Sequence, residues 1–343
     1  MELRQLEYIV AIADQGNITK AAESLFITQS GLNQQLIKLE QELGIQLFYR
    51  DKHHLQMTAA GKVYVENARE IMNIKKNTYN ILSDMKNNTV GEITLGLTLE
   101  HGIDLFTFVF PKFNRRFPGI NFHLQERYVA QQHSLIGAGH LDFGLVMLGE
   151  QDKVNLEYIP LYEEDMLLGI PLGHPYAGLG AAPDSPLPFI DLKRFSNDTF
   201  ALMFPNSTMR GIIDPAFKAA GFKPKILIET GMNHALIKLA TTGLCCTILP
   251  HSRALCSPDR SGLAWFRLSP SLSWTTYIAY RKSTHLSEAS RYFIQLAREY
   301  GEELAHEKRK GFLAGIMKMD VIMSAILDGG KGVNSGGHRK RHS

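Results

Sequence analysis

The sequence has few cysteines, no long apolar run and no clear excess of charge. Its three cysteines lack metal-ligand spacing, and two of them stand in the apolar run GLCCTILP, which indicates buried thiols acting as small hydrophobic side chains. No apolar stretch approaches the roughly 20 residues that span a bilayer. Charged residues at the start of the chain interrupt any secretory signal. We therefore expect a cytoplasmic protein.

Enzyme signatures are also missing from the sequence. It contains no phosphate-binding GxxxxGK[ST], no GxSxG nucleophile motif and no HExxH zinc motif, and its thirteen histidines are scattered. We therefore expect no catalytic residue, no metal site and no cofactor. At 343 residues the chain is long enough for two or three domains with substantial cores.

Residues 18–41, ITKAAESLFITQSGLNQQLIKLEQ, predict two short helices joined by a tight turn. Asn17 or Thr19 can cap the first helix and Thr28 the second, because their oxygens can accept from free backbone N–H groups. The second helix has an apolar stripe formed by Leu32, Leu36 and Leu39. Its other face carries side chains able to pair with base edges in a major groove: Gln29, Ser30, Asn33, Gln34 and Lys38.

Two short alternating runs around a polar turn follow, at residues 47–50 and 55–61. They predict a two-stranded wing with Arg50, Lys52 and His53 near its tip. For residues 18–41 taken alone, the alternative is an ordinary helical hairpin whose polar face is solvated.

Residues 1–61 resemble the winged helix-turn-helix of the LysR-type transcriptional regulators. The resemblance rests on Leu6, Ala21, Ala22, Gln29, Ser30, Leu32, Gln35, Leu39, Glu40, Leu43, Gly44, Leu47, Phe48, Arg50, Thr58, Ala60 and Gly61. It implies a DNA-binding regulator of transcription. Asn33, Gln34 and His53 depart from the usual pattern of the family, so we expect base preference and backbone affinity to differ from those of relatives.

The charge distribution gives the DNA-binding end no support of its own. Residues 1–90 hold ten basic and ten acidic side chains, whereas residues 301–343 hold eight and five, which accounts for the net charge of +3. Binding therefore depends on locally placed groups. We expect four residues to read bases: Gln29, Ser30, Asn33 and Gln34. We expect the phosphate backbone to be held by Thr28, Lys38, Arg50, Lys52 and His53.

Residues 58–88 predict one long helix. Apolar or small residues recur at alternating steps of three and four, as in a coiled-coil seam: Tyr64, Ala68, Ile71, Ile74, Thr78, Ile81 and Met85. The seam predicts a homodimer that presents two recognition helices to a roughly palindromic site. Packing of this helix within its own domain is the alternative.

From residue 91 onward the pattern changes to alternating strands and helices, which is typical of an α/β domain with a mostly parallel sheet. We predict strands at 92–98, 121–127, 142–147, 156–161, 165–171, 200–204, 225–229, 245–249, 263–268 and 274–280. We predict helices at 102–117, 133–139, 207–220, 232–242, 287–300 and 305–327.

This region also resembles the LysR family, whose effector domain is similar to a periplasmic binding protein. The likenesses include Gly96-Leu97-Thr98, Phe117-Pro118, Gly139 to Asp142, Pro160-Leu161, Gly173-His174-Pro175 and Leu249-Pro250. The predicted fold class is thus multidomain: an all-α winged helix-turn-helix with a long linker helix, then a two-lobed α/β effector domain.

The predicted boundaries follow from these patterns. The DNA-binding domain spans 1–58, the linker and dimerisation helix 59–90, and the effector domain 91–300. Lobe one is 91–160 with 269–300, and lobe two is 161–268. Residues 301–343 would add a helix and a disordered basic tail.

The resemblance implies a small-molecule effector bound between the two lobes. Ligands of such domains bind at the carboxyl ends of strands, where helix N-termini favour anions. We expect contributions from Thr98, Leu99, Glu100, His101, Tyr128, Ser207 and Thr208. Glu100 would suit an amino group, so the effector is expected to be anionic or amino-acid-like. Plain helix capping by the hydroxyls is the alternative.

The predicted partners are double-stranded DNA, the effector and further copies of the chain in a homodimer or homotetramer. RNA polymerase is a further partner that the resemblance allows, and no membrane is expected. The alternative functions are a cytoplasmic small-molecule binding protein and an enzyme fused to a helix-turn-helix.

Overall fold

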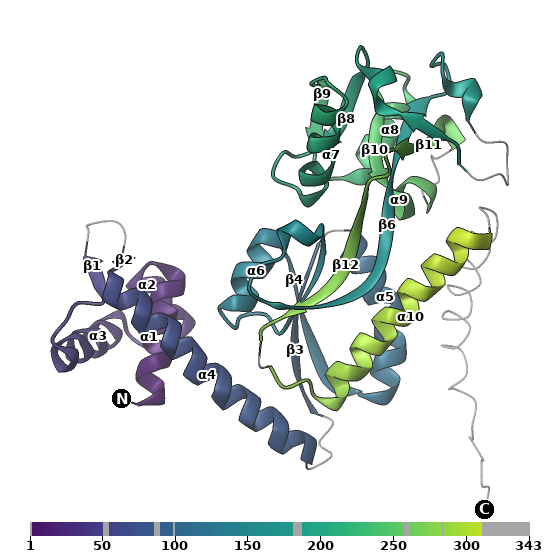
Figure 1. Cartoon of the computed structure of the whole chain (residues 1–343). Coiled ribbons are helices and arrows are strands. Elements are labelled where there is room, and N and C mark those ends of the chain that lie inside the picture. Colours follow the sequence, from purple (N-terminus) through teal and green to yellow (C-terminus); the bar gives the residue numbers. More distant parts are fainter. Residues whose placement is uncertain are drawn as a thin grey trace, which may run out of the picture. The chain divides into compact units, whose positions relative to one another are not determined.

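The computed structural model describes residues 2–50, 55–85, 90–98, 100–180, 187–256, 261–282 and 284–310. The chain divides into two compact units (Figure 1). Unit 1 contains Met1–Val146, Val154–Ile159 and Ile278–Leu296, and unit 2 contains Met147–Lys153, Pro160–Tyr277 and Ala297–Ser343. Within the described ranges, none of the helices combines the length and apolar character needed to cross a membrane.

Unit 1 begins with a winged helix-turn-helix. Its elements are α1 (Leu3–Gln15), α2 (Ile18–Ser24), α3 (Gln29–Leu43) and an antiparallel pair of strands, β1 (Phe48–Arg50) and β2 (Leu55–Met57). The helices enclose a buried core that includes Ile9, Ile12, Ala21, Ala22, Leu32, Leu36, Leu39, Leu47 and Phe48. The predicted apolar stripe of the second helix is therefore confirmed.

Local hydrogen bonds fix the ends of these helices. The Asn17 side chain, not Thr19, caps α2, because its oxygen accepts from the backbone N–H groups of residues 19 and 20 at 2.8 and 3.1 Å. The Thr28 hydroxyl caps α3 by accepting from the Gly31 N–H at 3.2 Å. Helices α1 and α3 end at Gly16 and Gly44, whose φ angles of 56° and 67° suit glycine.

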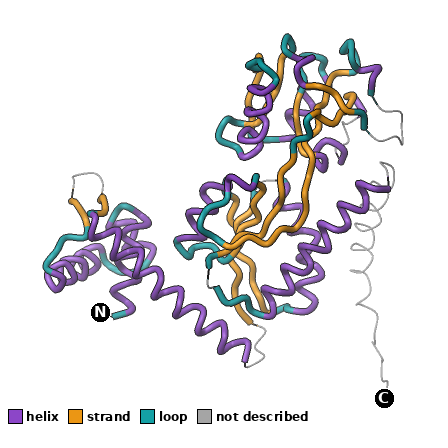
Figure 2. The backbone as a smooth tube through the Cα atoms, in the orientation of Figure 1, coloured by secondary structure: helices purple, strands orange, loops and turns teal. Residues whose placement is uncertain are grey.

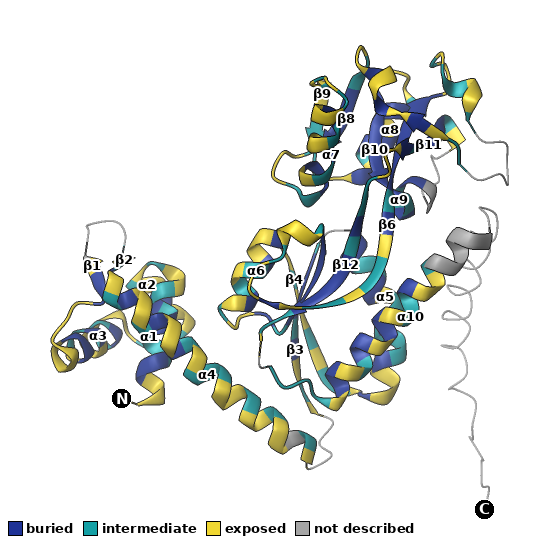
Figure 3. Cartoon of the chain, viewed as in Figure 1, coloured by how far each residue is buried: buried dark blue, intermediate teal, exposed yellow. Residues whose placement is uncertain are grey.

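Helix α4 (Ala59–Met85) confirms the long helix predicted after the wing. Its first half packs on α1, where Tyr64, Ala68 and Ile71 contact the cluster of Leu6 and Val10. Its second half leaves apolar side chains exposed: Ile74 by 62%, Ile81 by 36% and Met85 by 75%. Figure 3 shows this change along the helix. The predicted seam thus divides into a part used within the chain and a part open to solvent.

The rest of unit 1 alternates strands and helices (Figure 2). Strands β3 (Val90–Leu97), β4 (Gly119–Glu126) and β5 (Phe143–Leu148) are parallel and lie in the order β4-β3-β5. They are connected by α5 (His101–Arg116) and α6 (Val129–Gly137). The core of this part includes Leu95, Leu97, Val109, Phe113, Leu145 and Phe293.

Unit 2 is built around strand β6 (Glu157–Pro171). Its residues 166–169 pair antiparallel with β10 (Thr247–Pro250), and its residues 167–171 pair antiparallel with β11 (Leu263–Ser269). Strand β11 also pairs in parallel with β7 (Phe189–Asp191). Strands β8 (Thr199–Met203) and β9 (Lys225–Thr230) are parallel. Backbone hydrogen bonds from the Ala201 and Cys246 N–H groups join β8 to Cys246, the residue before β10.

Helices complete unit 2. They are α7 (Thr208–Ala219), α8 (Asn233–Thr241), α9 (His251–Cys256) and the short 3-10 turns Glu150–Asp152, Ala177–Leu179 and Leu192–Phe195. The core contains Phe195, Phe200, Leu202, Ile213, Phe217, Leu236, Ile248 and Phe266. Strands β6 and β12 (Ser273–Tyr280) contribute residues to both units.

Several predicted elements differ from the structure. The two strands predicted at 156–161 and 165–171 are one strand, β6, whose acidic residues are satisfied by tertiary contacts. Glu164 accepts from the Ser252 N–H at 2.5 Å and from the Trp274 indole at 3.1 Å. Strand β7 and helix α9 were not predicted.

The C-terminal helix is also longer than predicted. Helix α10 (Glu288–Lys310) continues through the expected end at residue 300. A Cβ at Gly301 would approach the Tyr162 ring to 2.9 Å, so this glycine permits close packing and does not end the helix. The predicted extra helix and basic tail lie largely outside the described residues.

The start of α4 offers a test of the winged domain. A Cβ at Gly61 would lie 2.0 Å from the Leu47 carbonyl oxygen, so Gly61→Ala must displace backbone. We expect the variant to lose about 1–3 kcal/mol of stability. The matched control is Gly211→Ala in α7, where no described atom lies within 4 Å of the new methyl group. Thermal unfolding followed by circular dichroism checks both, and a Gly61→Ala midpoint at or above that of the parent would contradict the expectation.

Candidate DNA-binding and effector-binding sites

Helix α3 has one buried and one exposed face. Leu32, Leu36 and Leu39 are at most 2% exposed. The opposite face presents the predicted base-reading and backbone-contacting residues: Gln29, Ser30, Gln34 and Lys38 are exposed, and Asn33 is half-buried. Thr28 is exposed although its oxygen caps the helix. Five of these six predicted residues are therefore exposed, and Asn33 is half-buried.

The predicted wing contacts are only partly described. Arg50 ends β1, but its side chain, together with Lys52 and His53, lies outside the described residues. These three roles stay predictions.

A junction between α3 and the wing was missed by sequence reasoning. The buried Glu40 carboxylate accepts from the Leu47 N–H at 2.8 Å and from the Phe48 N–H at 3.2 Å. Thr58 donates its N–H to the Leu47 carbonyl at 2.9 Å and its hydroxyl to the Gln46 carbonyl at 2.8 Å. The junction fixes the wing on the recognition helix. The sequence signal for this junction is Glu40, a charged residue at the position that continues the apolar stripe of Leu32 and Leu36.

In unit 1 the predicted effector residues gather at one edge of the sheet. Strands β3 and β4 pair in register from Val90 opposite Gly119 to Leu97 opposite Glu126, so their carboxyl ends coincide. Thr98 follows β3, and Tyr128, which is 46% exposed, follows β4. Beside them lies His101, the buried first residue of α5.

Glu100 and Leu99 complete this loop in the sequence. Glu100 has φ 66° and ψ −72°, a backbone conformation that side chains larger than glycine rarely adopt. Such strain is concentrated at functional sites, which is consistent with the predicted role of this loop. Leu99 lies outside the described residues.

Gln132, which sequence reasoning did not single out, supports the same edge. Its side chain is fully buried and donates to the Arg127 carbonyl at 2.9 Å. The neighbouring strands leave room for it with glycines, since a Cβ at Gly144 would lie 2.7 Å from its Oε1. The glycine in each strand was the available sequence signal.

In unit 2, Ser207 caps α7 by accepting from the Arg210 N–H at 3.3 Å, and Thr208 is the first helical residue. The predicted helix capping by Ser207 is therefore confirmed. The buried Arg210 guanidinium fixes the loop before the helix, because it donates to the Met203 carbonyl at 3.0 Å.

Two carboxylates neutralise this arginine. Arg210 meets Asp214 and Glu229 at 2.7 Å each, and these contacts raise its pKa against the opposing effect of burial. A charge that is already paired twice is not available to an incoming anion. Arg210 therefore acts as a positioning residue for the Ser207 loop.

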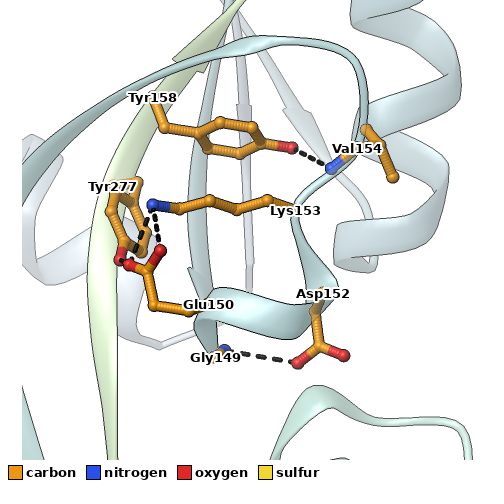
Figure 4. A network of polar contacts seen from close by, with 7 residues as sticks. All are labelled: Gly149, Glu150, Asp152, Lys153, Val154, Tyr158 and Tyr277. Carbon is orange, nitrogen blue, oxygen red and sulfur yellow. Dashed lines mark hydrogen bonds and ion pairs between the residues drawn. The ribbon is translucent and has the colours of Figure 1, made fainter.

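A second polar network follows β5 (Figure 4). Lys153 Nζ lies 2.8 Å from the Glu150 carboxylate, the Tyr277 hydroxyl donates to the same carboxylate, and Lys153 Nζ lies 4.4 Å from the centre of the Tyr277 ring. The Lys153 and Tyr277 hydrogen bonds lower the pKa of Glu150, and the bond to Glu150 raises the pKa of Lys153. The network fixes the short segment between β5 and β6.

The two described thiols are poor nucleophiles. Burial raises the pKa of Cys245, and burial together with Asp198 and Cys245 raises the pKa of Cys246 to about 12. Because the thiolate is the reactive form, these thiols stay protonated at neutral pH. This confirms that both behave as buried hydrophobic side chains.

Cys246 also lies near His174 and Asp198, whose donor atoms come within 4.8 Å of one another. The His174 Nδ1 accepts from the Tyr176 N–H at 3.1 Å, which leaves its Nε2 protonated to donate to Asp198 at 3.1 Å. A metal bound at Nε2 would displace that proton. In protein metal sites the histidine nitrogen that does not bind the metal usually donates a hydrogen bond, whereas His174 Nδ1 accepts one. The cluster therefore serves as a structural hydrogen-bond set.

Comparison with known families decides the assignment. The LysR substrate binding domain family matches residues 86–302, and the bacterial regulatory helix-turn-helix protein, lysR family, matches residues 3–62. The chain belongs to the LysR family. It is a LysR-type DNA-binding transcriptional regulator with an effector-binding domain.

Individual relatives agree with this assignment. The uncharacterized HTH-type transcriptional regulator YybE of Bacillus subtilis (strain 168) is 26% identical over 296 residues, which cover 86% of this regulator and 97% of the relative. The DNA-binding transcriptional dual regulator OxyR of Escherichia coli (strain K12) is 31% identical over 183 residues, which cover 53% and 60%.

Solved structures share the fold. Full-length OxyR from Pseudomonas aeruginosa, as a cysteine-to-aspartate variant, has a TM-score of 0.66 and 22% identity, covering 87% of this regulator and 98% of that chain. Full-length CbnR complexed with its target DNA has a TM-score of 0.52 and 23% identity, covering 87% and 99%. The predicted fold class is confirmed.

The α3–wing junction generates a prediction. Glu40→Ala leaves two buried backbone N–H groups unpaired, so we expect a loss of about 1–3 kcal/mol of stability. Glu42→Ala removes an exposed carboxylate from the same helix and should be nearly neutral. Urea unfolding of the two variants checks this difference, and equal midpoints would show that the junction contributes little.

Proposed function

We propose that this LysR-type regulator reads operator DNA as a homodimer and responds to a small anionic or amino-acid-like effector. The observation that carries the DNA-reading part is the open polar face of α3, which lies over a buried apolar face in a domain of the matched family. Such a helix can enter a major groove while the rest of the domain fixes its angle.

The proposed roles divide α3 and the wing by chemistry. Amides and hydroxyls pair with base edges, so Gln29, Ser30, Asn33 and Gln34 read sequence. Cations and caps meet phosphates, so the backbone is held by Thr28, Lys38, Arg50, Lys52 and His53. Exposure of Gln34 and Lys38 on neighbouring turns supports this division.

Dimerisation is proposed to use the second half of α4. Its exposed apolar residues include Ile74, Tyr79, Ile81, Leu82 and Met85, whereas the first half of the helix is occupied by α1. An exposed apolar stripe on a long helix favours pairing with the same stripe of a second copy. The edge strand β9 exposes Ile226, Leu227 and Ile228, which supports a further contact between effector domains in a tetramer.

Each of two loops is proposed as an effector-contacting segment, Thr98–His101 in unit 1 and Ser207–Thr208 in unit 2. Support comes from their positions at the carboxyl ends of β3 and β8 and from the N-terminus of α7, an end of a helix that favours anions. Because Arg210 is already neutralised, the Glu100 carboxylate favours a ligand that also carries an amino group. Binding would shift the population of two arrangements of the regulator and thereby change the DNA bend.

The base-reading role of α3 predicts different effects for two substitutions. Gln34→Ala should cost roughly 1–3 kcal/mol at the operator and relax the preference at one base pair. Arg50→Ala should weaken operator and unrelated DNA alike and reduce the salt dependence of binding. Footprinting and binding titrations over a range of salt separate the two effects. Equal losses on both DNAs from both variants would contradict the division of roles.

The effector site predicts ligand-dependent stabilisation. Titrating the full-length regulator with organic acids and amino acids should reveal compounds that raise its thermal midpoint, as linkage requires. Thr98→Ala should abolish the shift. The control is Thr107→Ala on the exposed side of α5, which should retain it. A panel with no active compound, or an unchanged shift in Thr98→Ala, would count against this site.

A further inference from the structure

Phe26 stands in the turn between α2 and α3 and points its side chain to solvent. The side chain is 95% exposed, the largest exposure among the described large hydrophobic residues. Its neighbour Ile27 packs against the core of the winged domain instead. Within the described residues the ring gains almost no burial, so a partner outside the chain is what could remove it from water.

The backbone at Phe26 is unfavourable for any residue other than glycine. Its φ is 54°, in the left-handed region. The Phe26 N–H donates to the Glu23 carbonyl at 3.1 Å and the Ile27 N–H to the Ala22 carbonyl at 3.0 Å, which is the hydrogen-bond pattern of a Schellman helix end. Glycine is the usual residue there.

The same domain supplies the comparison. The positive-φ positions that end α1 and α3 are occupied by Gly16 and Gly44, at 56° and 67°. The winged domain therefore uses glycine at two such helix ends and phenylalanine at the third, where a side chain adds strain. Strained backbone positions cluster at functional sites.

The position of Phe26 shows what it can contact. It precedes the cap Thr28 by two residues, and the exposed residues Gln29 and Ser30 follow directly. The N-terminal end of a recognition helix is the part that approaches base edges. The apolar group that a major groove offers at its edge is the C5-methyl group of thymine.

We propose that Phe26 is a DNA-contacting residue whose ring packs on thymine methyl groups beside the bases read by α3. The strained turn holds the ring outside the protein, where DNA buries it. This inference rests on the proposed reading of DNA by α3, and it adds an apolar element of specificity to a set of residues that is otherwise polar.

The test compares the full-length protein with Phe26→Gly on the tightest-binding duplex selected from a random-sequence pool. Phe26→Gly relieves the left-handed strain, so its thermal midpoint should rise while its DNA affinity falls by about five- to tenfold. The same duplex is then made with deoxyuridine in place of thymidine, which removes only the methyl groups. The parent should lose affinity by a similar factor, and the variant should lose clearly less.

The control is Leu43→Ala. Leu43 is 44% exposed and ends α3, about 21 Å along the helix from Gln29 at 1.5 Å per residue. It should bind both duplexes as the parent does. Sedimentation of Phe26→Gly should match the parent, because a change in oligomeric state would mean that a second copy of the chain covers the ring and would overturn the proposal.

Two other outcomes also overturn it. Unchanged affinity in Phe26→Gly would show that the ring does not touch DNA, and equal uracil losses in parent and variant would show that it does not touch methyl groups. The Gln34→Ala variant shows whether the inference about Phe26 or the proposed reading of DNA by α3 has failed. If that variant loses affinity and Phe26→Gly does not, only this inference fails, whereas no effect of either substitution would remove the proposed reading by α3.

Discussion

The winged domain depends on the hydrogen bonds made by the backbone between α3 and the wing. Two side chains, Glu40 and Thr58, account for the N–H groups of Leu47 and Phe48 and for the Gln46 carbonyl. A buried backbone group without a partner costs free energy comparable to a lost hydrogen bond. Because the same contacts join α3, β1 and the start of α4, the recognition helix, the wing and the long helix form one body. Gly61 is the residue that allows their backbones to meet.

The elements with a strong local pattern could be predicted from the sequence. The apolar stripe of α3, the caps at Asn17 and Thr28, and the parallel strands that follow residue 90 are set by residues close together in the chain. The open face of α3 followed from the same stripe, because a helix with one buried side must expose the other. The family resemblance supplied the two-lobed architecture, which no local pattern contains.

The rest depends on contacts between residues far apart in sequence. Residues 162–164 fall between two predicted strands, but in the structure they lie inside β6, where Glu164 accepts hydrogen bonds from the Ser252 N–H and the Trp274 indole. The Glu150–Tyr277 bond and the Arg210–Glu229 pair are hidden for the same reason. At the candidate effector site, the sequence gives the loops and the strand ends, but the identity of the ligand depends on the three-dimensional placement of a few polar atoms.

The exposed second half of α4 has a consequence for the concentration of the regulator in a cell. Within the described residues Ile74, Ile81 and Met85 are exposed, and the proposed pairing with a second copy would bury them. Self-association of this kind follows mass action, so both the durability of the fold and the occupancy of a two-fold site would rise with copy number. In the proposed homodimer, expression level would then be a second input beside the proposed effector. A cell that dilutes the regulator as it grows would silence it without any change in its ligand.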